Sequence, residues 1–281
     1  MNATLEYFRF FKYAPTLDQY HLFQKEKMDK SEIVQRIERD KELIITNSRV
    51  AYKSDIHLIE LSEMRSIISQ RKLESKHRFL RFLGLIPLIQ FIGVSGSVAA
   101  GNAKEDDDVD VFIISRAGWL WTTRFFILLI SSLLGARRYP KDTKYKDKLC
   151  FNLFFDESDL AIPQDKQTEY VGHEVLQLVP VVNKNGTYEN FFSANNWVIK
   201  LFPNARDLPF PRSLSFSRMR ESIPGSPGFH FVQPEDDKIG FIESLFMKFQ
   251  LFIMRKNRTT ERITNTQLWF FPDDFEKRMV K

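Results

Sequence analysis

The strongest constraint on the fold is a polar stretch that separates two apolar runs in the middle of the chain. The first run, residues 91–95, ends at Gly96-Ser97, and the second opens with Asp108-Val109-Asp110. Alternate side chains of a strand share a face, so Asp108 and Asp110 point the same way while Val109 points into the core. The pattern predicts two strands joined through a Gly-Ser turn and a short polar linker.

Two carboxylates on one strand face repel each other unless a cation lies between them. Magnesium is the cation that suits a carboxylate pair together with nucleotide phosphates. A plainer interpretation is an acidic surface turn over residues 105–108, between two buried strands. The apolar strands, the Gly-Ser corner and the in-phase pair of Asp108 and Asp110 together favour a cation and phosphate site.

This arrangement resembles the active-site signature of the polymerase-beta-type nucleotidyltransferase superfamily. That signature is a hydrophobic residue, Gly, Gly or Ser, a spacer of about ten residues, then Asp, a hydrophobic residue, and Asp or Glu. The match spans about twenty-five residues and consists of Val94, Gly96, Ser97, Asp108, Val109 and Asp110. The order of a helical N-terminal unit, this core and a helical C-terminal part is similar to uncharacterised bacterial nucleotidyltransferase-domain proteins.

The resemblance implies a metal-dependent transfer of a nucleoside monophosphate from a nucleoside triphosphate such as ATP to an acceptor. Gly96 and Ser97 would hold the triphosphate, and Asp108 and Asp110 would bind the catalytic Mg²⁺ or Mn²⁺. In the linker, Asn102 and Lys104 are candidates for a further phosphate contact. The acceptor is open between a protein, an RNA and a small molecule.

A third apolar run, residues 149–155, predicts a strand beside the Asp-x-Asp strand. The superfamily commonly places a third carboxylate on such a strand, and here the corresponding polar residue is Asn152. An Asn offers a metal a neutral oxygen but neither charge nor basicity, so Asn152 is a candidate third ligand without being a base. Asp156 becomes the missing acid only if the strand is shifted or bulged. A non-catalytic nucleotide-binding or regulatory protein is therefore the alternative function.

Residues 1–56 predict a small unit that resembles a winged helix-turn-helix, with three helices followed by a two-stranded hairpin. Thr16 and Ser31 are the expected N-caps of the second and third helices. Because Glu32 and Glu38 dilute the basic face of the third helix, a structural or docking role is favoured over DNA binding.

The remaining chain divides into connecting helices over 57–87, a nucleotidyltransferase core over 88–160 and a helical C-terminal region over 161–281 with a Pro-rich loop at 203–235. The expected fold class is α+β, with a mixed sheet flanked by helices. Basic residues of the connecting helices, such as Arg65 and Lys72, are expected on a solvated outer face. A helix over 166–179 carries His173 and Glu174, either as packing residues or, facing the sheet, as groups that handle a proton.

Charge and cysteine content narrow the partners and the compartment. A net charge of +5 and a pI near 9.1 favour anionic partners. One cysteine, Cys150, excludes an internal disulfide framework, predicts no cysteine-based metal site and fits the reducing cytoplasm. The first residues show no signal-peptide pattern. The apolar stretch 119–134 contains Arg124 and is shorter than the about 20 residues of a membrane span. We expect a buried core helix there and no stable membrane insertion, with membrane anchoring as the alternative.

Overall fold

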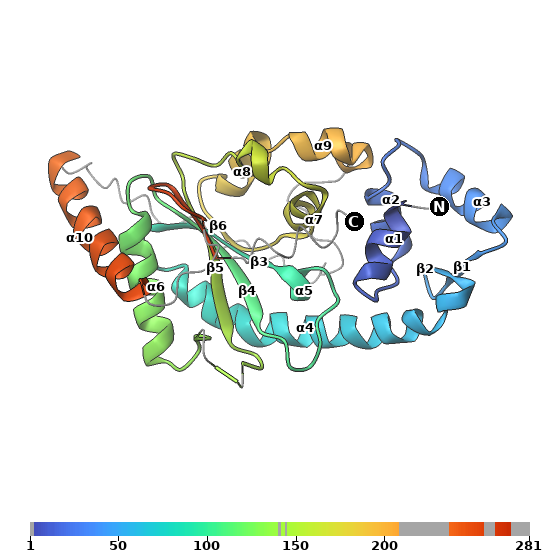
Figure 1. The fold of residues 1–281 in the computed structure, drawn as a ribbon, viewed down its shortest axis with the longest axis horizontal. Helices are drawn as coiled ribbons and strands as arrows, with labels where there is room; N and C mark the ends of the chain where they lie inside the picture. Colours follow the sequence, from blue (N-terminus) through green and yellow to red (C-terminus); the bar gives the residue numbers. More distant parts are fainter. Residues whose placement is uncertain (1–2, 140–141, 144, 208–235, 256–261, 271–281) are drawn as a thin grey trace.

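The computed structural model describes residues 3–139, 142–143, 145–207, 236–255 and 262–270. Within these residues six strands form one sheet in the order β6-β3-β4-β5-β8-β7, in which only β4 and β5 run parallel. Helices cover both faces of the sheet (Figure 1). The predicted mixed sheet flanked by helices is therefore confirmed. The strands are β3 (Ile89–Ser95), β4 (Val109–Ser115), β5 (Leu149–Asp156), β6 (Val179–Asn183), β7 (Arg262–Ile263) and β8 (Gln267–Trp269).

Alternation along the central strands divides the apolar side chains between two cores. On one face, Val109, Val111 and Ile113 of β4 pack against α4 (His57–Leu83), α6 (Leu120–Leu133) and α10 (Asp236–Met254). On the other face, Phe112 and Ile114 pack against α7 (Glu169–Gln177), α8 (Thr187–Ala194) and α9 (Trp197–Leu201). Asp110 belongs to the second face, so the predicted site lies on the side covered by α7 to α9 (Figure 1).

The N-terminal unit contains α1 (Ala3–Phe10), α2 (Leu17–Leu22), α3 (Lys30–Arg39) and the hairpin β1 (Leu43–Thr46) with β2 (Arg49–Tyr52). Thr16 caps α2 through a capping box, as predicted. The cap of α3 is Asp29, two residues before the expected Ser31, and the Asp29 N–H donates to Glu32 Oε2 at 3.0 Å. Asn47 and Ser48 both have positive φ, the conformation that a two-residue hairpin turn requires.

A single helix, α4, replaces the expected set of connecting helices and runs 27 residues from the hairpin to the sheet (Figure 1). The apolar stretch 119–134 forms α6, with Leu120, Trp121 and Ile127 buried against the sheet. Among the described residues we find no helix with the length and apolar character needed to span a membrane.

The C-terminal region differs most from expectation. Buried Asn195 separates α8 from α9, and its side-chain amide forms hydrogen bonds with the backbone of Leu160, Phe191 and Ile162. A strand, β8, pairs with β5 inside the region that was expected to be helical. From the Pro-rich loop 203–235 the structure describes a short 3₁₀ turn, Pro203–Asp207, and residues 208–235 lie outside the described residues.

Candidate functional site

Gly96 forms the corner between β3 and the short helix α5 (Gly96–Ala99). Its φ of +64° is readily available only to glycine, and a Cβ at this position would collide with the Asp110 carboxylate. The Gly96 N–H donates to Glu174 Oε2 at 3.0 Å. Two independent constraints thus require glycine at the position that the sequence motif singled out.

Asp108, Asp110 and Cys150 bring their ligand atoms together within 4.8 Å. Asp110 lies on β4 directly opposite Cys150 of the parallel strand β5, and Asp108 precedes β4 by one residue. The predicted pair of in-phase carboxylates is therefore assembled, and a thiol joins it. Two carboxylates so close together have the donor chemistry of a divalent-cation site.

Burial, followed by the negative charges of Asp108 and Glu174, raises the pKa of Asp110 to about 8. Burial, followed by the negative charges of Asp110 and Asp108, also raises the pKa of the Cys150 thiol, so the thiol keeps its proton. Arg138 is the cation that compensates this acidic cluster, since its guanidinium donates to Asp108 Oδ2 at 2.6 Å. Asp110 therefore keeps its proton at neutral pH in the metal-free protein, and a bound divalent cation would displace that proton.

Asn152 occupies a bulge in β5, where the pairing with β4 shifts by one residue between Val111 and Phe112. The Asn152 side-chain Nδ2 donates to Asp110 Oδ1 at 2.5 Å, while the side-chain oxygen Oδ1 of Asn152 has no hydrogen-bond partner among the described residues. Asn152 therefore orients Asp110, and a metal contact through its oxygen stays a prediction. Asp156 is not the missing acid, because it pairs with Ser115 at the far end of β4 and accepts from the Gly118 N–H.

A third carboxylate reaches the site from α7. Glu174 accepts the Gly96 N–H, forms a hydrogen bond with the Tyr170 hydroxyl, and has a pKa raised by burial. Of the two interpretations of the pair His173 and Glu174, the sheet-facing one applies to Glu174. The sequence signal for it was only that an acidic residue follows buried positions on a helix.

His173 faces the N-terminal unit instead. Its ring stacks between Tyr7 and Phe23, with centroid distances of 3.7 and 3.8 Å. Burial lowers its pKa well below the usual value, and neither ring nitrogen has a hydrogen-bond partner in the described residues. His173 is a neutral packing residue that joins α7 to α1 and α2.

The linker between Gly96 and Asp108 is held by one face of α4. The Arg65 guanidinium donates to Asn102 Oδ1 at 2.8 Å, and Ser69 Oγ accepts the Ala103 N–H at 2.9 Å. Lys72 Nζ donates to the backbone oxygens of Glu105 at 2.8 Å and Asp107 at 2.7 Å. The expectation that Arg65 and Lys72 are solvated is wrong, since only 8% and 1% of their surfaces are exposed. Their polar groups are buried because they satisfy linker backbone and amide groups.

The other predicted phosphate ligands differ in the hydrogen bonds that they already form within the protein. Ser97 Oγ donates to Asp107 Oδ2 at 3.1 Å and lies on the first turn after Gly96. Asn102 is committed to the scaffold, because its amide also donates to the backbone oxygen of Phe11. Lys104 is exposed, and its N–H donates to Asp107 Oδ2. Gly96 thus lies against the Asp110 carboxylate and Ser97 against that of Asp107, whereas Asn102 contacts the N-terminal unit.

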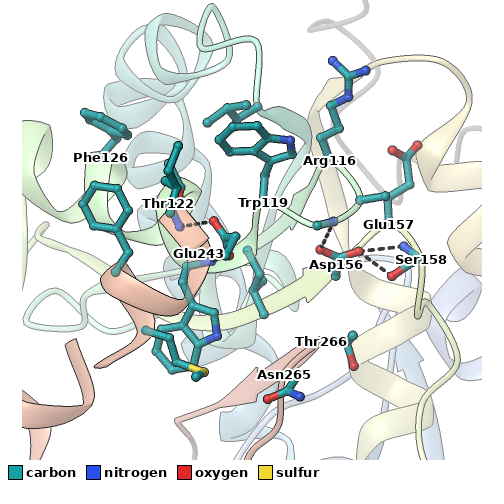
Figure 2. A pocket seen from close by; sticks show the side chains of 18 of the residues that line it. Arg116, Trp119, Thr122, Phe126, Asp156, Glu157, Ser158, Glu243, Asn265 and Thr266 are labelled. Atoms are coloured by element: carbon teal, nitrogen blue, oxygen red, sulfur yellow. Dashed lines mark hydrogen bonds between the residues drawn. The ribbon is translucent and has the colours of Figure 1, made fainter. Parts of the chain in front are cut away.

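Another cavity has none of Asp108, Asp110 and Cys150 in its lining, and Figure 2 shows Glu243 and Asp156 among the residues that line it. It measures about 1300 Å³ and is bounded by α6, α10 and the loop that follows β4. Its carboxylates already serve the backbone, since Glu243 accepts the N–H groups of Trp121 and Thr122 at 2.9 Å and Asp156 accepts that of Gly118. A cavity of about 240 Å³ lies on the other face and borders Gly96, Asp110 and Glu174.

Compared with known proteins, the chain matches no family model, no curated protein and no solved structure. The function is therefore argued from the geometry alone.

Replacing Arg138 with Gln is expected to tighten Mn²⁺ binding about three- to tenfold, because the cation that now neutralises Asp108 competes with the metal, and a partly exposed ion pair is modest in strength. Calorimetric titration measures the dissociation constant. Arg137→Gln is the matched control, since Arg137 lies over the Tyr139 ring instead. Equal affinities in all three proteins would contradict a metal at Asp108.

Proposed function

We propose that the chain is a metal-dependent nucleotidyltransferase of the polymerase-beta type, which moves a nucleoside monophosphate from a nucleoside triphosphate to an acceptor. The observation that carries the proposal is the convergence of Asp108 and Asp110 beside the Gly96-Ser97 turn. Transfer from a triphosphate requires that the phosphates be positioned and their charge neutralised. The Asp-x-Asp strand, the Gly96 corner and the linker held by α4 suit these two tasks.

Asp108 and Asp110 would hold Mg²⁺ or Mn²⁺, since their carboxylate oxygens lie within 4.8 Å of each other. When bound, the ion would neutralise phosphate charge and orient the triphosphate. Asn152 holds Asp110 in place through the hydrogen bond to Oδ1. The Ser97 hydroxyl and the N–H groups of the α5 turn would grip the terminal phosphates. Arg138 would turn from Asp108 to the phosphates, where its charge is equally well compensated.

Asn152 also favours a second candidate, a non-catalytic nucleotide-binding or regulatory protein. It occupies the strand position where a third carboxylate is common, and it donates to Asp110 rather than offering a base. Glu174 counts against this candidate, because it supplies a third carboxylate from another element. The helices and hairpin of residues 3–52 resemble a winged helix. We propose that this unit docks on α7 through the stack of His173 between Tyr7 and Phe23.

The test is transfer of label from each α-³²P nucleoside triphosphate, with Mg²⁺ or Mn²⁺, to a cell lysate or RNA. We expect label on an acceptor fraction with the wild type and none with Asp108→Ala. Asp106→Ala is the matched control, because Asp106 lies in the same acidic run but is exposed. Transfer retained in Asp108→Ala would refute the assignment. Metal-dependent nucleotide binding without any transfer would select the regulatory candidate.

A further inference from the structure

The cavity of about 240 Å³ touches the proposed metal and phosphate groups only at one end, where Gly96 and Asp110 line it. Its walls are largely apolar and come from both layers of the fold: Phe112 and Phe155 from the sheet, Val175 and Leu178 from α7 and its end, and Trp269 from β8. An apolar cavity of about 150 Å³ is known to hold benzene. This one therefore has room for an aromatic ring with a short chain.

The polar groups of the cavity gather at the end that faces the Gly-Ser turn. Glu174 lies there with one carboxylate oxygen on the Gly96 N–H, and Tyr170 forms a hydrogen bond with it. Ser95 also lines the cavity, and its hydroxyl is buried with no hydrogen-bond partner among the described residues. A buried hydroxyl without a partner is unfavourable unless a ligand or a water molecule supplies the missing hydrogen bond.

These features select the chemistry of the occupant. The polar end holds the carboxyl groups of Asp110 and Glu174, and none of the lining residues is cationic, so the cavity does not suit a phosphate or an acid. A purine has polar atoms around its whole edge, whereas the far walls of this cavity are carbon. A neutral molecule with an apolar body and one hydroxyl at its end matches both the walls and the polar end.

We propose that this cavity holds the acceptor of the transfer reaction, an alcohol whose apolar body lies among Phe112, Val175 and Trp269 and whose hydroxyl meets Glu174. The inference rests on the proposed nucleotidyl transfer and names its acceptor class. The acceptor oxygen forms a bond to the α-phosphorus, and its proton passes to the Glu174 carboxylate. The bond from the α-phosphorus to the bridging oxygen breaks, and pyrophosphate leaves with that electron pair.

The first experiment detects the site without nucleotide or metal. The full chain, labelled at Ile, Leu and Val methyl groups, is titrated with 3-phenylpropan-1-ol and followed by NMR. We expect saturable shifts at Ile162, Val175 and Leu178, which line the cavity, and smaller ones at Leu88 and Ile130, which line the larger cavity. Shifts confined to Leu88 and Ile130, or absent, would overturn the proposal whether or not the protein transfers label.

The second experiment connects the site to the reaction. Glu174→Gln keeps an oxygen for the Gly96 N–H but cannot take up a proton. We expect it to retain the methyl shifts while transfer falls about 10²- to 10⁴-fold, the usual contribution of a general base. In the wild type, 3-phenylpropan-1-ol should inhibit transfer in competition with the acceptor fraction and not with the nucleotide.

The outcomes separate the two proposals. Transfer that proceeds undisturbed by a cavity-bound alcohol would refute the acceptor assignment and leave nucleotidyl transfer standing. Adenosine that displaces the alcohol from the same methyl groups would make the cavity a nucleobase site and overturn the proposal. Cavity binding without any transfer, from any nucleotide, would refute the nucleotidyltransferase function and the acceptor role with it.

Discussion

Asp110→Asn is expected to stabilise the metal-free protein at neutral pH while abolishing metal binding and lowering transfer by at least about a hundredfold. The pKa of Asp110 is about 8 in the folded protein, against an ordinary value of 3.8. Between these values the unfolded chain loses the proton and the folded protein keeps it. The contribution of Asp110 to folding stability is therefore most favourable below pH 4, becomes less favourable as the pH rises and levels off above pH 8. Asparagine removes this penalty and can still accept from Asn152.

Each pKa unit corresponds to about 1.4 kcal/mol, and the partial solvent access of Asp110 reduces the full effect. We expect a gain on the order of 2 to 4 kcal/mol at pH 7, and almost none at pH 4, in the free energy of unfolding by urea. Asp106→Asn, at an exposed position of the same acidic run, should change little at either pH. A variant that is destabilised at pH 7 would contradict the raised pKa.

Lys72→Met is expected to destabilise the protein by about 3 to 5 kcal/mol, because it removes a fully buried ammonium group from its partners. The Lys72 Nζ donates to two linker oxygens, on Glu105 and Asp107, and to the Asp147 carboxylate. Methionine fills a similar volume but leaves the two backbone oxygens without their donor. Since those oxygens lie just before Asp108, the loss should also weaken Mn²⁺ binding.

Urea unfolding measures the stability change, and calorimetric titration measures the Mn²⁺ affinity. Lys76→Met, one turn further along α4 at a partly exposed position, should cost less than about 1 kcal/mol. Asp147→Asn should also be mild, because the Asp147 side chain is 36% exposed and regains water. If Lys72→Met and Lys76→Met unfold alike, the linker is not held by Lys72.

The local part of the site could be predicted from the sequence. The period of two on either side of the Gly-Ser turn placed Asp108 and Asp110 on one face, and the fold keeps that arrangement because Val109 and Val111 are buried on the other. The need for glycine at residue 96 was also implicit, since the motif combines a sharp corner with a close carboxylate.

The long-range part of the site could not be predicted from the sequence. Cys150 joins the aspartates only because β5 runs parallel to β4 in one particular register, and no local pattern encodes that pairing. The bulge at Asn152 depends on the same register. Glu174 arrives from a helix 78 residues after Gly96, so its role depends on how α7 packs on the sheet.

The burial of the basic residues on α4 was not predicted, for a different reason. Lysine and arginine are almost always solvated, and that expectation fails only where backbone oxygens stand ready to receive them. Lys72 meets this condition because the linker folds back over α4, and Arg65 meets it at the backbone oxygens of Phe11 and Lys12 after α1. Periodicity does not reveal either contact. Strand β8 was missed because three residues are too few for an alternating pattern.

The most direct measurement is a crystal structure of the full chain with Mn²⁺ and a non-hydrolysable nucleoside triphosphate analogue. We predict an anomalous peak at metal-ligand distance, about 2.1 to 2.2 Å, from carboxylate oxygens of both Asp108 and Asp110. The triphosphate should lie on the Gly96-Ser97 turn, and Arg138 should have left Asp108. An intact Arg138–Asp108 pair with Mn²⁺ and nucleotide bound elsewhere would contradict the proposed nucleotidyltransferase site.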